Sequence, residues 1–264
     1  MTLALRLTLL ALLLKPIGSG WLRPSILALA VAGLVLPRVL RHPVLWLALA
    51  GLAGWRVIAG WPLADNHAYL LAYWCLAVAF VRLAPEPRRA LAWNARTLLG
   101  LAFAFATLWK LLSPDYLDGR FFRVTLVEDR RLERLAVALG GIDRDTLQAR
   151  REFVAQHADG PALAGTPPPE PQELRSLAFA ATWLTLALEA AIALAFLAPL
   201  GSRVWLRHAL LLLFCATTYA VAPVVGFGWL LLALGAAQLD PGARLTRIAY
   251  VAVFGLLVFY YHAP

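Results

Sequence analysis

Nine apolar segments run along the chain, and mostly short polar stretches separate them. The segments are residues 3–18, 22–37, 43–60, 67–84, 91–112, 174–199, 204–222, 224–238 and 244–262. A helix needs about 20 apolar residues to cross the hydrocarbon core of a bilayer, and several segments approach this length. The pattern predicts an all-α fold, a polytopic transmembrane helix bundle with eight or nine spans. We expect a single transmembrane domain over residues 1–264.

One connection, residues 113–173, is long and too charged to enter lipid. It begins with FFRVTLVEDRRLERLAVALGG at 121–141, whose apolar residues recur at helical spacing, so we expect an amphipathic helix on the outer membrane surface. A second helical stretch is expected around Arg144–Gln156. The segment GPALAGTPPPEPQEL that follows is rich in proline and is expected to be extended. The simplest interpretation of this connection is an outward-facing cap without chemistry.

Composition supports a membrane protein and excludes some functions. Hydrophobic residues make up 61% of the chain, and the mean hydropathy is +0.71. The net charge of +9 comes from arginines in short clusters rather than from a basic face, so nucleic-acid binding is not expected. The clusters on alternate connections are Arg38 and Arg41, Arg82 with Arg88 and Arg89, Arg203 and Arg207, and Arg244 and Arg247. Because cytoplasmic loops carry the excess of arginine, the amino terminus is predicted to be cytoplasmic and the carboxyl terminus extracytoplasmic.

The first apolar segment has two interpretations. MTLALRLTLLALLLKPIGSG has a weakly basic start and a short apolar core, which is compatible with a cleaved signal peptide. Lys15 and Pro16 follow the core directly and no clear A-x-A site is present, which favours a retained span. The two cysteines, Cys75 and Cys215, lie inside predicted spans and are expected to be inert buried thiols.

Polar groups inside the apolar segments need partners, because an unpaired charge in hydrocarbon costs several kcal/mol. The candidates are Lys110, Glu189, Arg56, Arg96, His67 and the cluster Thr217-Thr218-Tyr219. Arg56 and Arg96 lie near segment ends, where arginine can reach the head groups, so structural roles are favoured for them. In the predicted orientation the lysine, the histidine and the hydroxyl cluster lie at one outward depth. Glu189 lies near the middle of its segment and is expected to pair with Lys110 or Arg96, which at its simplest only fixes helix packing.

Lys110 is an unusual choice of cation. Only Lys15 and Lys110 are lysines among the 24 basic residues. An amine can lose its proton where a guanidinium cannot, and desolvation favours the neutral amine, so Lys110 is a candidate general base. The competing interpretation is a lysine that extends to the membrane surface.

Three stretches carry their polar residues in an informative order. They are WPLADNHAYL at 61–70, WNARTLLG at 93–100 continuing to WKLLSPDYLDG at 109–119, and WLTLALEAAIALAFLAP at 183–199 followed by FCATTYAVAPVVGFGWLLLA at 214–233. In order and approximate spacing, over residues 43–240, they resemble the vitamin K-dependent gamma-glutamyl carboxylase and its bacterial relatives, the HTTM (horizontally transferred transmembrane) proteins. This resemblance implies a location in the bacterial inner (plasma) membrane.

The resemblance also implies a site. Lys110 would be the base that deprotonates vitamin K hydroquinone or menaquinol, and oxygen would then convert the quinol into a strongly basic alkoxide. His67 would support the base, and Glu189 would orient or neutralise its partners. The residues expected to contact the quinol are Asn66, Trp109, Thr218 and Tyr219. No metal is expected.

The sequence departs from the family pattern in ways that affect function. Cys215 stands where the family commonly has a histidine, and Trp109-Lys110 stands in place of the lysine pair of the animal enzyme. No large outer domain follows the last segment, so we expect a separate protein to recognise any substrate.

Three classes of function stay open. Quinol-dependent oxygenation or carboxylation comes first, with the enzyme resembling a carboxylase or an epoxidase. A non-catalytic scaffold or lipid-binding protein comes second; there Lys110 pairs with Asp115 or Asp118, and Trp109, Tyr116 and the phenylalanines at 121 and 122 anchor the interface. A transporter comes last, because only the Pro223–Gly228 break suggests an interrupted helix.

Overall fold

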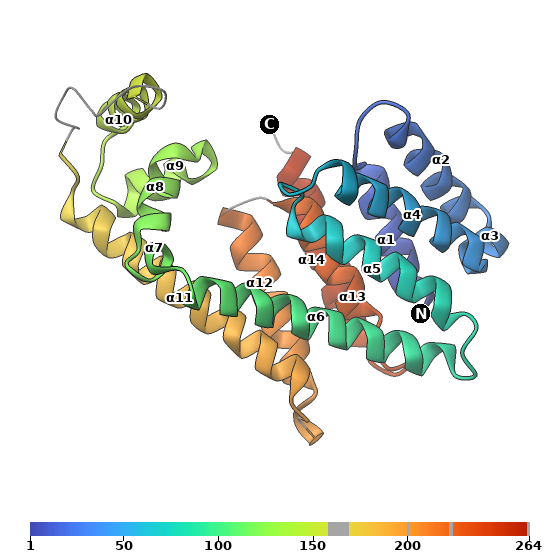
Figure 1. The fold of residues 1–264 in the computed structure, drawn as a ribbon. Helices are drawn as coiled ribbons and strands as arrows, with labels where there is room; N and C mark the ends of the chain where they lie inside the picture. Colours follow the sequence, from blue (N-terminus) through green and yellow to red (C-terminus); the bar gives the residue numbers. More distant parts are fainter. Residues whose placement is uncertain (158–168, 200, 222–223, 263–264) are drawn as a thin grey trace. The chain divides into compact units, whose positions relative to one another are not determined.

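The protein is almost entirely helical (Figure 1). The computed structural model describes residues 1–157, 169–199, 201–221 and 224–262. Helix accounts for 82% of the chain, and these ranges contain no strand. The all-α prediction is therefore confirmed. The proline-rich stretch predicted to be extended falls mostly on residues 158–168, outside the described residues.

Each predicted apolar segment contains one main helix with similar bounds. These helices are α1 (Thr2–Leu14), α2 (Leu22–Val35), α4 (Pro43–Ala59), α5 (Asn66–Val81), α6 (Pro87–Leu111), α11 (Gln172–Leu197), α12 (Trp205–Val221), α13 (Val225–Ala236) and α14 (Arg244–His262). A short helix, α3 (Pro37–Arg41), links two of them. Proline occupies the first turn of α3 and α4. Backbone N–H groups in a first turn have no acceptor within the helix, so the missing N–H of proline costs no hydrogen bond there.

Three of the described helices, α6, α11 and α14, are long and apolar enough to cross a membrane. Each exposes large apolar side chains, such as Phe105, Leu184 and Phe259, to the surroundings of the protein. Exposed apolar surface of this kind is typical of contact with lipid. The other apolar helices have 10–17 residues, and at about 1.5 Å per residue a helix of that length falls short of a bilayer core of about 30 Å. A membrane protein is supported, and the count of eight or nine spans stays a prediction.

The chain divides into two compact units, which are described separately. The first comprises Met1–Phe103, Ile192–Ala220 and Val224–Pro264, and the second comprises Ala104–Ala191 and Val221–Pro223. Helices α6 and α11 each contribute residues to both units.

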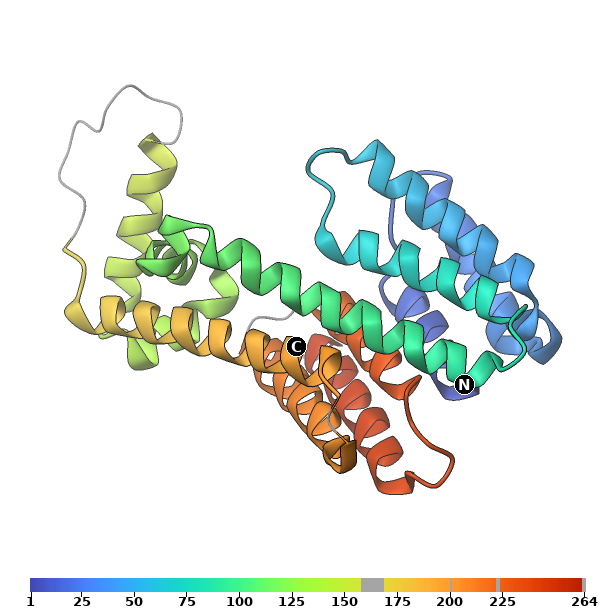
Figure 2. The same ribbon diagram turned by 60° about the horizontal axis from the view of Figure 1, so that its bottom comes forward.

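The first unit is built around α13, which is apolar on all sides. Its residues from Trp229 to Ala236 are buried, as expected for a helix without a polar face. Helices α1 and α14 pack on it, and α4 and α5 lie side by side in both views (Figures 1 and 2). Two buried indole groups find acceptors nearby: Trp74 Nε1 donates to Thr8 Oγ1 at 2.9 Å, and Trp46 Nε1 donates to the Leu40 carbonyl at 2.9 Å.

The second unit contains a folded cap in place of one amphipathic helix. Its elements are α7 (Pro114–Leu117), α8 (Arg120–Glu128), η1 (Arg130–Leu132), α9 (Glu133–Leu139) and α10 (Arg144–His157). The predicted helix over 121–141 is interrupted at Asp129, whose backbone is extended and whose carboxylate accepts a hydrogen bond from the Arg131 N–H at 3.0 Å. The second helical stretch is confirmed as α10, which Asp143 caps by accepting from the Thr146 N–H at 2.8 Å.

The apolar positions of the cap form a core of their own. Its members come from α8, η1, α9, α10 and the start of α11, and they are Leu126, Val127, Leu132, Ala136, Ile142, Leu147, Leu174 and Ala178. The apolar face of α8 is therefore used for packing within the protein. Gly119 makes the entry to α8 possible, because its φ of +79° is left-handed, a conformation that residues with a side chain rarely adopt.

A charged cluster fastens the cap to α11. The Glu170 carboxylate, just before α11, accepts hydrogen bonds from both Arg123 on α8 and Arg175 on α11. Burial raises the pKa of Glu170, but hydrogen bonds and charge attraction from Arg123, together with Arg175 and Arg150, outweigh burial and leave this pKa below its ordinary value.

We predict that Glu170→Gln loosens the cap. The amide weakens both arginine contacts, so local opening should become easier by about 1 kcal/mol, or roughly fivefold to tenfold. Hydrogen exchange of the α8 and α9 amides measures this opening. Glu128→Gln, at an exposed position of α8, should leave the rates unchanged. Equal exchange in both variants would contradict the role assigned to Glu170.

The same cluster makes the cap sensitive to acid. A carboxylate with a lowered folded pKa stabilises the fold fully above its ordinary value of 4.5, and this contribution is lost as pH falls through the lower folded value. The difference in opening free energy between wild type and Glu170→Gln should therefore be constant above pH 5 and shrink below about pH 4. Hydrogen exchange corrected for the intrinsic rate at each pH tests this dependence.

Candidate functional site

A buried ion pair forms in the second unit between the end of α6 and the middle of α11. Lys110 Nζ donates to Glu189 Oε1 at 2.6 Å and to Oε2 at 2.5 Å. The two side chains are 22% and 9% exposed. Charge-assisted hydrogen bonds of this length are strong, and the apolar helices around the pair exclude most water. Of the two partners expected for Glu189, the structure brings in Lys110.

The nearby acids take other partners. Asp115 lies 2.8 Å and Asp118 3.4 Å from guanidinium nitrogens of Arg120, at the start of α8. The boundary salt bridge expected between Lys110 and one of these aspartates is therefore replaced by a local cluster. Local pairing is favoured because Arg120 follows both acids within five residues and needs no distant contact.

Tyr116 covers the ion pair from α7. Pro114 starts this short helix directly after α6, and the Tyr116 ring comes to lie with its centroid 5.5 Å from Lys110 Nζ. The ring also packs against Phe121 and Phe122. A cation over an aromatic face is attracted to it, more strongly where water is excluded.

The Tyr116 hydroxyl is buried and faces Thr185, but among the described residues it makes no well-formed hydrogen bond. Burial raises the pKa of Tyr116 well above its ordinary value, and the nearby Glu189 charge raises it further. Tyr116 is therefore a neutral phenol that can donate a hydrogen bond. It was expected to anchor the interface; its ring is buried instead, whereas Trp109 is 77% exposed.

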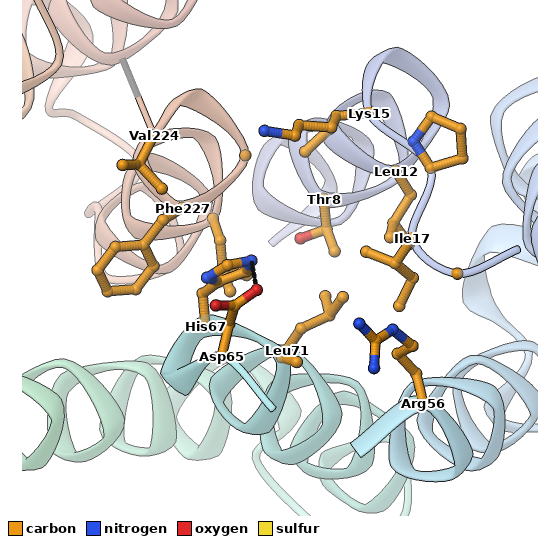
Figure 3. A pocket seen from close by; sticks show the side chains of 16 residues that line it. Thr8, Leu12, Lys15, Ile17, Arg56, Asp65, His67, Leu71, Val224 and Phe227 are labelled. Atoms are coloured by element: carbon orange, nitrogen blue, oxygen red, sulfur yellow. Dashed lines mark ion pairs between the residues drawn. The ribbon is translucent and has the colours of Figure 1, made fainter. Parts of the chain in front are cut away.

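His67 and its neighbours line a cavity of about 200 Å³ in the first unit (Figure 3). His67 Nε2 lies 3.7 Å from the Asp65 carboxylate, just before α5 begins at Asn66. Asn66 itself is exposed and does not line the cavity. Arg56, at the end of α4, does line the cavity. Its side chain therefore has a defined place inside the protein, whereas the sequence suggested only an arginine that reaches the lipid head groups.

Aromatic contacts link His67 to the hydroxyl cluster of α12. The ring centroid of Phe227 lies 6.0 Å from that of His67 and 6.5 Å from that of Tyr219. Tyr219 is buried, and Thr218 beside it is half-buried. Phe227 thus lies between His67 and Tyr219 within the first unit, whereas Lys110 and Glu189 belong to the second unit, so the expected convergence of all these residues stays a prediction.

Arg96 has the structural role expected of it. Its Nε donates to the Phe196 carbonyl at 2.7 Å, at the end of α11. Arg207 on α12 donates to the Ala195 carbonyl at 2.5 Å and to the Ala198 carbonyl at 3.0 Å. The two arginines donate to carbonyl groups at the end of α11, where the helix supplies no N–H donor. Their positive charge also suits the carboxyl end of a helix.

A second buried polar pair was not anticipated. His208 Nδ1 on α12 lies 2.9 Å from the Tyr250 hydroxyl on α14, and both side chains are buried. Tyr250 fits against Gly235 of α13, where an added Cβ would lie 2.5 Å from the ring. A histidine inside an apolar segment is itself the signal that singled out His67, and the same rule applied to His208 would have found this pair.

We predict that Lys110 and Glu189 stabilise the second unit only as a pair. Lys110→Met or Glu189→Leu alone leaves a buried charge without its partner and should cost about 2–3 kcal/mol, whereas the double variant should lose clearly less than the sum. Unfolding in mixed detergent micelles measures each value, with Arg89→Gln as an exposed control. Additive losses would show that the two groups do not interact energetically.

Comparisons with known proteins add no relative. No family model, no curated protein and no solved structure matches this chain. Its own residues and their geometry therefore carry the functional conclusions.

Proposed function

We propose that the protein is a multi-pass membrane protein in which the Lys110–Glu189 pair accepts a proton from a lipid-soluble quinol. The observation that carries this proposal is a lysine amine held against both oxygens of a buried carboxylate at 2.5–2.6 Å in a hydrophobic setting. The sequence resemblance to the vitamin K-dependent carboxylase family supports it, because that resemblance assigns the base to Lys110. A bacterial plasma membrane and an extracytoplasmic carboxyl terminus belong to the same proposal.

The pair can exchange a proton without creating an isolated charge. In the proposal the Lys110 ammonium first gives one proton to the Glu189 carboxylate, which leaves a neutral amine beside a carboxylic acid and keeps the net charge at zero. A quinol hydroxyl then gives its proton to the Lys110 amine: its O–H bond breaks, a new N–H bond forms, and the phenolate left behind faces an ammonium group. Glu189 holds the other proton and keeps the amine in place. Positioned bases of this kind contribute about 10²–10⁴-fold to a proton transfer.

Tyr116 is suited to hold the quinol oxygen. Its buried hydroxyl still needs a hydrogen-bond partner, and its neutral form is a donor. A phenolate oxygen would accept that bond, and charge-assisted hydrogen bonds are the stronger ones. The supporting role of His67 and Asn66, and the ring contacts of Trp109, Thr218 and Tyr219, stay expectations of the resemblance. Reaction with oxygen, carboxylation and a separate recognition protein rest on the resemblance alone.

Quinol turnover by the purified protein tests the proposal. The full chain in lipid nanodiscs is supplied with menaquinol and oxygen, and quinol and epoxide are quantified by chromatography. We expect Lys110→Arg, which keeps the charge, to reduce the rate at least about 100-fold, because a guanidinium does not give up its proton. Arg89→Gln should leave the rate unchanged. A Lys110→Arg protein with full activity would exclude the amine as the base.

A non-catalytic scaffold or lipid-binding protein is the second candidate. The Lys110–Glu189 contact favours it as well, because an ammonium bound to both carboxylate oxygens also stabilises the packing of two long helices, α6 and α11. For a scaffold, wild type would consume no quinol above the rate of empty nanodiscs. Lys110→Arg would then keep wild-type stability.

A further inference from the structure

Four helix ends meet at the cavity of the first unit. Its lining comes from the end of α1 and the turn after it, the end of α4, the start of α5 and the start of α13. These ends lie together because consecutive apolar helices run in opposite directions. Figure 3 shows Lys15, Arg56 and the Asp65–His67 pair on different sides of one space. The quinol proposal makes no use of Lys15 or Arg56.

The walls of the cavity are apolar and its rim is charged. The main apolar contributors are Leu12, Ile17, Leu71, Phe227 and Leu230. The Thr8 hydroxyl also lines it, but it already donates to the Ala4 carbonyl at 2.9 Å and accepts from Trp74 at 2.9 Å. The polar groups left to meet a ligand are therefore the charged ones and the imidazole.

Positive charge is in excess at this rim. Lys15 and Arg56 each carry one positive charge, and Asp65 carries the opposing carboxylate. That carboxylate lies beside His67, and within the described ranges neither Lys15 nor Arg56 forms an ion pair. Lys15 Nζ lies 5.6 Å from the Tyr261 ring centroid, a contact that leaves its N–H groups able to donate elsewhere. One further negative charge would balance the site.

Gly226 leaves room for the lysine stem. A Cβ at this position of α13 would lie 3.2 Å from Lys15 Cδ, tighter than most such contacts, so a side chain there would push the Lys15 stem aside by a few tenths of an ångström. The absence of a side chain at Gly226 keeps the aliphatic part of Lys15 against α13 with its ammonium at the rim. This arrangement suits a cation that reaches past apolar surface to a polar head group.

We propose that this cavity binds the singly charged oxyanion head group of a lipid, with Lys15 and Arg56 as its donors and the acyl chain along the apolar wall. An arginine fork and a lysine ammonium together suit a carboxylate or a phosphodiester. The cavity, at about 200 Å³, is smaller than sites for drug-sized ligands, which occupy about 300–1,000 Å³, so it fits a head group and the first part of a chain. An uncharged lipid would leave the extra positive charge unbalanced.

Binding is measured by native mass spectrometry of the delipidated full chain with four probes. Oleate and phosphatidylglycerol carry a single negative charge on acyl chains, monoolein supplies a chain without charge, and inorganic phosphate supplies an anion without a chain. We expect one or both charged lipids to bind at least about tenfold more tightly than monoolein and phosphate, the difference that one charge-assisted contact gives. Whichever charged lipid binds more tightly identifies the source of the head group.

Matched variants locate the binding to this cavity. Lys15→Gln and Arg56→Gln should each weaken binding of the charged lipid about tenfold and leave monoolein unchanged. Lys15→Arg should retain binding, and Arg38→Gln on α3, outside the lining, should have no effect. Gly226→Val should weaken binding by displacing Lys15. Circular dichroism and elution volume confirm that each variant is folded.

Three results would overturn the proposal. Monoolein binding as tightly as oleate and phosphatidylglycerol would show a purely apolar site. Phosphate alone binding equally tightly would show a soluble-anion site, and wild-type affinity in both Lys15→Gln and Arg56→Gln would place the lipid elsewhere. None of these results depends on quinol turnover, so this inference and the proposed function fail independently.

Discussion

A polar group placed among apolar helices is costly unless it finds a partner inside the protein, and this constraint determines the main contacts between the helices. Water is too scarce there to satisfy N–H groups, carbonyls and charges, and an unsatisfied group costs several kcal/mol. Lys110 finds Glu189, His208 finds Tyr250, and the Trp74 indole finds Thr8. Each of these contacts joins residues from different helices, so the polar pairs also fix which helices lie together.

The helices themselves could be predicted well, because each forms from one continuous apolar run whose ends are marked by proline or arginine. The number of membrane crossings could not be predicted. Helices of 10–17 residues cross a bilayer only if the bilayer thins or flanking side chains reach its surface, and helix length does not show whether this happens. The cap was predicted less well. Apolar spacing over 121–141 indicated one helix, but the Asp129 carboxylate offers the Arg131 N–H a competing acceptor and breaks it.

The candidate site, too, could be predicted only in part. The need of Glu189 for a cation followed from its position in an apolar run, but the sequence left both Lys110 and Arg96 open as its partner. The choice depends on Arg96 meeting the carbonyl groups at the end of α11, a contact between residues about a hundred positions apart. Tyr116 and Lys15 were underestimated for a similar reason. Each lies next to a polar turn in the sequence. Tyr116 is buried only because α7 folds back, and the Lys15 stem lies against apolar surface only because Gly226 has no side chain.

The central place of α13 has a consequence for how the protein is made. Helix α1 is synthesised well before its main packing partner α13, which follows more than two hundred residues later. Contacts between such distant parts of a chain form slowly. During translation the surface of α1 that packs on α13 must therefore stay without this partner until α13 has been made. The first unit closes only when the late helix moves in between its early and its last neighbours.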